Sequence, residues 1–149
     1  AIGGYPVIVT STARRSFDES GALLYTLGDF PAAARQVAQE MNVPLIDLNK
    51  MTRDFYLALG VEESKHALVH YAANTFPNQK QSLQDNTHFN TYGASQIAKM
   101  VLMGIKEEKI PISKNIVDFS SYDPNHPDAF EAWDWPLSIK TSPVKPDGN

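Results

Sequence analysis

The chain has 149 residues, of which 42% are hydrophobic and 20% charged, a composition typical of one soluble globular domain. It contains no cysteine, which excludes disulfides, thiolate metal sites and a cysteine nucleophile. The formal net charge of −4 and the lack of a basic stripe argue against nucleic-acid binding, and no apolar stretch is long enough to predict a membrane span.

The net negative charge lies entirely in the last part of the chain. Residues 1–117 hold eleven acidic and eleven basic side chains, whereas residues 118–149 hold six acidic and two basic ones. The second segment also carries five of the ten prolines and several aromatic residues. We therefore predict a folded body over residues 1–117 and a separate acidic tail over residues 118–149.

The first part of the body alternates between strand and helix patterns. Residues 5–10, YPVIVT, form a short apolar run with β-branched residues, which predicts a buried strand. Apolar residues then recur at helical spacing over residues 28–42, with Asp29 placed to cap that helix and Pro31 in its first turn. Residues 43–48, VPLIDL, predict a second buried strand.

The rest of the body is predicted to be mainly helical. A helix is expected to begin with Asn49 as its cap and to end at Gly60, and residues 62–72 are expected to hold another short helix. A last helix ends near Lys109, and its apolar stripe consists of Ala94, Ile97, Ala98, Val101, Leu102 and Ile105.

Strands that alternate with helices predict a parallel sheet covered on both faces. The pattern shows only two strands, and two parallel strands do not form a stable sheet by themselves. We therefore expect either that another chain completes the sheet or that the sequence is part of a larger α/β domain.

A carboxylate and a histidine lie three residues apart in LQDNTHFNTYGASQIAKMV, just before the last predicted helix. In open α/β sheets, ligands bind on loops beyond the carboxyl ends of the strands, and residues 85–88 are expected to form such a loop. Asp85 would hold one ring nitrogen of His88 and leave the other free to take a proton from a hydroxyl. The alternative is that Asp85 is a turn or capping residue and His88 an ordinary surface residue.

Two further histidines and the aromatic tail offer weaker signals. His66 and His70 would share one face of a helix, but no carboxylate has the spacing of a zinc-hydrolase motif, so no metal is predicted. His126 lies in a proline-bounded turn and is expected to be structural or exposed. The tail's rings are expected to dock onto the body, with stacking on sugars as the alternative; they are Phe119, Tyr122, Phe130, Trp133 and Trp135.

Several blocks in order resemble the SGNH (GDSL-type) hydrolases, and most closely rhamnogalacturonan acetylesterase-like members. These blocks are GGYPVIVTSTARRSF, TLGDFPAAARQVAQEMNVPLIDLN, LGVEESK and DNTHFNTYGASQIAKMV, and the resemblance runs from about the first residue to Lys109. It implies the C-terminal half of a three-layer, flavodoxin-like α/β domain. It also implies that Asp85 is the acid and His88 the general base of a Ser-His-Asp triad, with no metal or organic cofactor.

The sequence departs from this family in one important respect. It contains neither the G-D-S block that supplies the nucleophilic serine nor the blocks that supply the oxyanion-hole glycine and asparagine. Ser11 and Ser16 flank the ARR loop and are predicted to be loop serines, and Ser95 lies in the last helix. The chain by itself is therefore expected not to hydrolyse esters, and its implied partner is the N-terminal half of the hydrolase domain.

The resemblance also implies a substrate and a place of action. The substrate class is an acetylated plant cell-wall polysaccharide such as rhamnogalacturonan, and the location is secreted or periplasmic in a bacterium, with no leader in this sequence. Arg14 and Arg15 would contact an acidic sugar or, by default, pair with Asp18, Glu19 or solvent. The alternative function is a non-catalytic carbohydrate-binding or scaffold fragment, and a third possibility is an esterase made of two chains.

Overall fold

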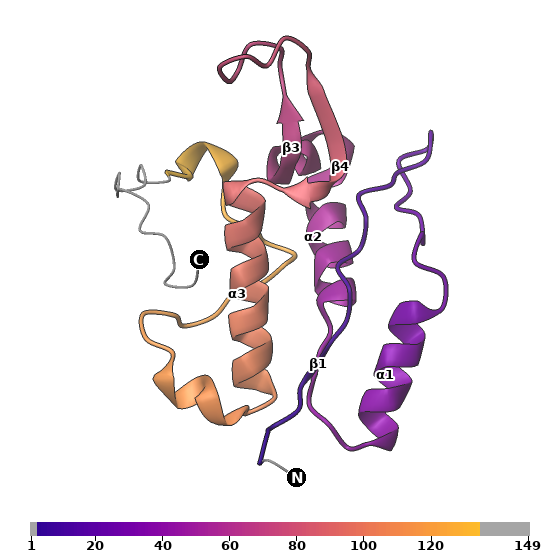
Figure 1. Cartoon of the computed structure of the whole chain (residues 1–149), viewed down its shortest axis with the longest axis vertical. Helices are drawn as coiled ribbons and strands as arrows, with labels where there is room; N and C mark the ends of the chain where they lie inside the picture. The colour runs from indigo at the N-terminus through magenta and orange to yellow at the C-terminus, as the bar shows by residue number, and fades with distance from the viewer. Residues whose placement is uncertain (1–2, 135–149) are drawn as a thin grey trace, which may run out of the picture.

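The structure is a computed structural model that describes residues 3–134 as a mixture of helices and short strands (Figure 1). In chain order the elements are β1 (Ile8–Val9), α1 (Phe30–Glu40), β2 (Leu45–Ile46), α2 (Leu48–Glu63), the 3₁₀ helix η1 (Ser64–Ala67), β3 (Leu68–Tyr71), β4 (Leu83–Phe89), α3 (Thr91–Glu107) and the 3₁₀ helices η2 (Pro111–Asn115) and η3 (Phe130–Ala132). None of the helices within the described residues is long and apolar enough to cross a membrane.

The two predicted strands exist and are parallel, as expected. Ile8 is opposite Leu45 and Val9 is opposite Ile46, and Thr10 N–H extends the ladder by donating to Ile46 O at 3.1 Å. Each strand has one partner among the described residues, so β1 keeps an unpaired edge. Val9 is 48% exposed, so β1 is not fully buried within the described residues, and the flanking strands that its apolar run led us to expect are not found within residues 3–134.

Helices pack beside this pair of strands. α1 lies next to β1, and α3 packs closely against β2 (Figure 1). Gly104 permits the close packing of α3 on β2, because a Cβ atom at this position would lie 2.7 Å from Cγ2 of Ile46. The centre of the core contains the fully buried side chains of Phe55, Tyr56, Leu68 and Met100.

A second sheet, β3 paired antiparallel with β4, was not predicted. The expected helix over residues 62–72 divides into η1 and β3, and the polar residues of β4 conceal its strand character in the sequence. The prediction of only two strands is therefore wrong, although the new pair forms its own sheet and does not complete the β1–β2 sheet. The whole is compatible with a part of an α/β domain.

The helix boundaries were partly predicted. The N-cap of α2 is Asp47, whose side chain accepts a hydrogen bond from Lys50 N–H at 3.2 Å, and the predicted cap Asn49 lies buried inside the helix. Gly60 breaks the helical geometry with a φ of 73°, as its predicted role as a stop requires, but a further turn follows it. Asp29 is the N-cap residue of α1 and Pro31 lies in its first turn, although the Asp29 side chain makes no capping hydrogen bond.

The described part of the tail returns beside α3 (Figure 1). Tyr122 is 8% exposed and its hydroxyl donates to Gln96 Oε1 at 2.8 Å. Phe130 stacks on His66 with ring centroids 4.3 Å apart, and Trp133 contacts Tyr92 edge to face. The predicted docking of the tail's aromatic rings is therefore confirmed for these residues, and Trp135 lies outside the described residues.

This docking changes which face of α3 is buried. The buried positions are Tyr92, Gly93, Gln96, Met100 and Gly104, whereas the predicted stripe is half-buried or, at Ala94 and Ala98, exposed. A glutamine can occupy the buried face because the tail satisfies its amide: Gln96 accepts from Tyr122 and donates to Asp128 at 2.9 Å.

Candidate functional site

The carboxylate–histidine pair lies on a bulge of β4. The register places Leu68 opposite Phe89 and His70 opposite Gln84, so Val69 alone faces the four residues 85–88. The sequence predicted a loop that leads directly into a helix. The structure instead places this segment within a strand, and α3 begins only at Thr91, after the capping residue Asn90.

Both oxygens of the Asp85 carboxylate are engaged within this bulge. Oδ2 lies 2.6 Å from Nδ1 of His88, while Oδ1 accepts from the backbone N–H of Thr87 at 2.7 Å and of His88 at 2.9 Å. These bonds, first the His88 N–H, then the imidazole and then the Thr87 N–H, lower the pKa of Asp85 to about 2. The carboxylate is therefore ionised at neutral pH and holds the imidazole by Nδ1.

The second ring nitrogen of His88 is directed away from this bond, and 77% of the His88 side chain is exposed. Within residues 3–134, no serine hydroxyl forms a hydrogen bond with His88. The Nε2 atom is therefore available to a group supplied from elsewhere.

A buried arginine holds the bulge in place. Arg15 Nη1 donates to Asn86 Oδ1 at 2.8 Å, its Nε donates to Ser64 Oγ at 2.8 Å, and its Nη2 donates to the carbonyl of Val61. Asn86 Oδ1 also lies 2.9 Å from His70 Nε2. Burial lowers the pKa of Arg15 from its usual value, but a guanidinium stays charged at neutral pH.

This role for Arg15 differs from the predicted one. The expected partners Asp18 and Glu19 do not bond to it, and Asp18 instead accepts from Ser20 and Ala22 within its own turn. Sequence reasoning missed Asn86 and Ser64 because their contacts with Arg15 span 71 and 49 residues.

The same contacts place the pair relative to the parallel strands. Arg15 lies on the loop after β1, so the bulge that it holds is at the carboxyl end of β1 and β2. In Figure 1 the β3–β4 hairpin is at the end of the molecule toward which β1 runs. That edge is where ligands bind in open α/β sheets.

The tail contains a second pair with the same local geometry. His126 Nδ1 lies 2.7 Å from Asp123 Oδ2, the backbone N–H of Asn125 donates to Asp123 Oδ1 at 2.9 Å, and the pKa of Asp123 is also lowered to about 2. As expected for a turn residue, His126 is exposed. An Asp-x-x-His turn thus builds this arrangement locally, so the surroundings of each pair must distinguish their roles.

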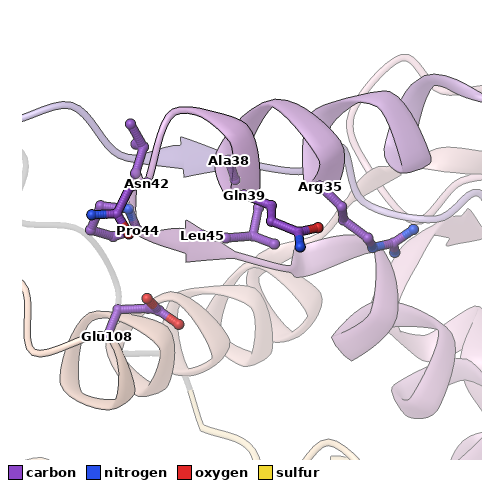
Figure 2. Close-up of a pocket in the computed structure, with 8 residues that line it drawn as sticks. Arg35, Ala38, Gln39, Asn42, Pro44, Leu45 and Glu108 are labelled. Atoms are coloured by element: carbon purple, nitrogen blue, oxygen red, sulfur yellow. The ribbon is translucent and has the colours of Figure 1, made fainter.

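The remaining sequence candidates are separated by the fold. His66 lies on η1 and His70 on β3, so they do not share a helix face as their spacing suggested. A cavity of about 540 Å³ lies beside the start of β2 (Figure 2). Its lining contains no histidine or serine and consists of Arg35, Ala38, Gln39, Asn42, Val43, Pro44, Leu45 and Glu108. It therefore does not include the Asp85–His88 pair.

An ionised carboxylate that holds a histidine at the carboxyl end of parallel strands is the acid–base arrangement of serine hydrolases with an α/β sheet. Comparison with known proteins shows which proteins the chain is similar to. The chain is 44% identical over 115 residues to rhamnogalacturonan acetylesterase RhgT of Bacillus subtilis (strain 168), and 33% identical over 115 residues to the probable rhamnogalacturonan acetylesterase YesY of the same strain.

These matches cover 77% of the chain but only 50% and 48% of the two relatives, so the chain spans about half the length of the curated relatives it matches. They confirm the resemblance inferred from the motifs and fit a C-terminal part of an SGNH hydrolase of the rhamnogalacturonan acetylesterase group. No family model matches the chain. No solved structure matches it either.

Proposed function

We propose that this chain is part of a carbohydrate esterase that removes acetyl groups from a plant cell-wall polysaccharide such as rhamnogalacturonan. The observation that carries the proposal is the 44% identity over 115 residues to a rhamnogalacturonan acetylesterase. The geometry of the Asp85–His88 pair provides chemistry that suits such an enzyme.

In this mechanism His88 is the general base and Asp85 orients it. Nε2 of His88 accepts the proton of a serine hydroxyl as the serine oxygen attacks the acetyl carbonyl carbon. The imidazolium, stabilised through Nδ1 by the ionised Asp85, then donates that proton to the sugar oxygen as its bond to the acetyl carbon breaks, so that the sugar leaves with a free hydroxyl and the acetyl group stays on the serine. A water molecule activated by the same nitrogen hydrolyses the acetyl-serine ester, and no metal or cofactor is required.

The nucleophilic serine and the oxyanion-hole donors belong to the N-terminal half of the domain, which is outside this sequence. Two surfaces support a missing partner. Within residues 3–134, the edge of β1 away from β2 has no strand partner, and Val9 is exposed. Phe30 and Val37 of α1 and its C-cap residue Met41 are also exposed, at 82%, 46% and 68%. We propose that further strands pair with the free edge of β1 and complete a three-layer, flavodoxin-like sheet. These strands come either from the same polypeptide or from a second chain.

The proposed place of action follows from the substrate. Polymeric rhamnogalacturonan lies outside the bacterial cell, so the enzyme would act as a secreted or periplasmic protein. Fractionation of producing cells, followed by detection of the chain in each fraction, tests this part of the proposal.

The catalytic role is tested by supplying the chain with a G-D-S-containing N-terminal half, either its own or that of RhgT, and measuring acetate release from acetylated rhamnogalacturonan. His88→Ala should lower kcat by a factor of roughly 10² to 10⁴, because general base catalysis is lost. His126→Ala is the matched control and should leave the rate unchanged, since its pair with Asp123 has the same local geometry. Equal losses from the two substitutions would contradict the role of His88.

The chain without that half is expected to release no acetate, because it lacks the G-D-S block. Turnover by the purified 149-residue chain would contradict this expectation. The alternative function, a non-catalytic carbohydrate-binding fragment, is still favoured by the lack of a G-D-S block in the sequence. The tail's aromatic rings no longer favour it, because Tyr122, Phe130 and Trp133 pack against the body.

A further inference from the structure

Tyr25 presents an aromatic ring to solvent on a rigid support. The guanidinium carbon of Arg53 lies 3.6 Å from the centre of the Tyr25 ring, so one ring face is covered by a cation. Tyr25 is nevertheless 82% exposed, which leaves the opposite face open.

Arg53 is itself fixed by the loop that carries this tyrosine. Its Nη1 and Nη2 atoms donate to the carbonyl oxygens of Leu24 and Leu23, each at 3.3 Å, and its backbone belongs to α2. The loop, the guanidinium and the helix therefore hold one another. A ligand that stacks on Tyr25 would meet a ring whose orientation is set in advance, which reduces the entropy lost on binding.

Tyr25 and Arg53 line a cavity of about 290 Å³ at the carboxyl end of β2. The other lining residues are Arg35, Asn49, Lys50, Asp54 and Leu57. Arg35 is paired with Asp47 and Lys50 with Asp54, whereas Arg53 forms no ion pair within residues 3–134. The cavity therefore contains more positive than negative charge, and its volume is near the lower limit of about 300 Å³ for ligand pockets.

Arg14 connects this cavity with the Asp85–His88 pair. Arg14 lines a smaller hollow that also includes Tyr25 and Arg53, and it is exposed. The next residue, Arg15, binds Asn86 in the bulge that carries the pair. Consecutive Cα atoms are about 3.8 Å apart, so the tyrosine platform and the candidate catalytic bulge meet at one short segment of the loop after β1.

We propose that Tyr25, supported by Arg53 and accompanied by Arg14, forms a binding subsite for a carboxylated sugar ring, that is, a uronic acid residue of an acidic polysaccharide. The open face of Tyr25 would stack on the apolar C–H face of the pyranose, as aromatic rings do with flat apolar surfaces. The guanidinium of Arg14 would pair with the sugar carboxylate. This inference rests on the proposed function for the identity of the ligand as a polysaccharide.

The test is the binding of trigalacturonate to the intact 149-residue chain, measured by NMR chemical-shift titration, with neutral galactotriose as the uncharged comparison. Tyr25→Ala should weaken trigalacturonate binding about fivefold or more, while Tyr25→Phe, which keeps the ring, should stay within about twofold of the native affinity. Arg14→Gln should weaken trigalacturonate binding and leave galactotriose binding unchanged. Tyr5→Ala is the matched control, because Tyr5 is also exposed, at 56%, but does not line the cavity.

No binding by the native chain, or equal binding by the native and Tyr25→Ala chains with both folds intact by amide spectra, would overturn the subsite. Equal affinity for the neutral sugar would overturn its assignment to carboxylated rings. Neither result depends on turnover, because binding is measured directly. Failure of the esterase proposal and failure of this subsite are therefore distinguishable.

Discussion

At the scale of single residues, two aspartates hold a histidine in the same way and have different surroundings. Asp85 and Asp123 each bond the Nδ1 of a histidine three residues later and a nearby backbone N–H. The Asp85 bulge is tied by Arg15 to the loop after β1, whereas the second pair lies in the tail. The local turn can be recognised from spacing alone. Its position at the strand ends depends on the hydrogen bond between Arg15 and Asn86, which are 71 positions apart in the sequence.

The hydrogen bonds at Asp85 predict a specific pH dependence. Its pKa is lowered from 3.8 to about 2, so ionised Asp85 stabilises the folded bulge above about pH 4, and this contribution is lost as the pH falls from 4 to 2. A carbon-13 NMR titration of the side-chain carboxyl should show the midpoint near 2. His88→Ala should raise the Asp85 pKa only part of the way to 3.8, because the backbone bonds from Thr87 and residue 88 remain. A native midpoint at 3.8 would show that the bonds do not persist in solution.

Substitution of Arg15 should destabilise the fold, whereas substitution of its neighbour Arg14 should not. Arg15→Met removes the bonds to Ser64, Asn86 and Val61 and should lower the free energy of unfolding by about 2 kcal/mol. Arg14→Met changes an exposed side chain and should stay within about 0.5 kcal/mol of the native value. Urea unfolding of the two variants measures the difference, and equal effects would mean that the Arg15 contacts contribute little.

At the scale of secondary structure, the start of α3 is clamped to the preceding elements. Asn90 Oδ1 accepts from Gly93 N–H at 3.0 Å, and Asn90 Nδ2 donates to the carbonyls of His66 at 2.7 Å and Leu68 at 3.0 Å. One side chain thus caps α3 and fixes it against η1 and β3. The bulge with the Asp85–His88 pair ends directly before this clamp.

The closeness of this packing predicts that position 93 tolerates only glycine. A Cβ atom there would collide with the backbone carbonyl oxygen of Ala67, which cannot move without shifting η1. Gly93→Ala should therefore lower the free energy of unfolding by about 3 kcal/mol. Gly4→Ala is the control, since a Cβ at Gly4 meets nothing within 4 Å and should change stability by less than about 0.5 kcal/mol. Similar thermal or urea unfolding of both variants would contradict the predicted collision.

The elements that were predicted and those that were missed differ in what forms them. β1, β2, α1, α2 and α3 follow from apolar runs or helical spacing, with Pro31 and Gly60 near their limits. The β3–β4 hairpin depends on pairing between Leu68 and Phe89, and its polar outward residues give no periodic signal. The buried face of α3 was misjudged because the partner that covers it, the tail, is distant in sequence.

At the scale of the whole molecule, the tail contributes to the core although it has no periodic pattern of its own. Tyr122 is buried, and Asp128 accepts from Lys99 and from the fully buried Gln96. The docking of these residues is observed, while the division of the chain into a body and a tail at residue 118 stays a prediction. The tail and α3 therefore depend on each other for the satisfaction of buried polar groups.

Removal of residues 118–149 should lower the melting temperature by roughly 10 °C, because it removes the aromatic contacts with Tyr92 and leaves the buried Gln96 without its partners Tyr122 and Asp128. Tyr122→Phe keeps the packing and removes only the hydroxyl bond to Gln96. It should cost about 1 kcal/mol, or roughly 3 °C. Scanning calorimetry on the two variants distinguishes packing from hydrogen bonding. An unchanged melting temperature after the deletion would show that the docking contributes nothing to stability.

Local patterns were sufficient for the three long helices, the two parallel strands, the Asp85–His88 turn and the family resemblance, because each arises from residues close together in the chain. The folded molecule was needed to bury Arg15 against Ser64 and Asn86, to pair β3 with β4 and to place Gln96 under the tail. Those features arise between residues 12 to 71 positions apart, and no local periodicity encodes which distant side chain will satisfy a buried polar group.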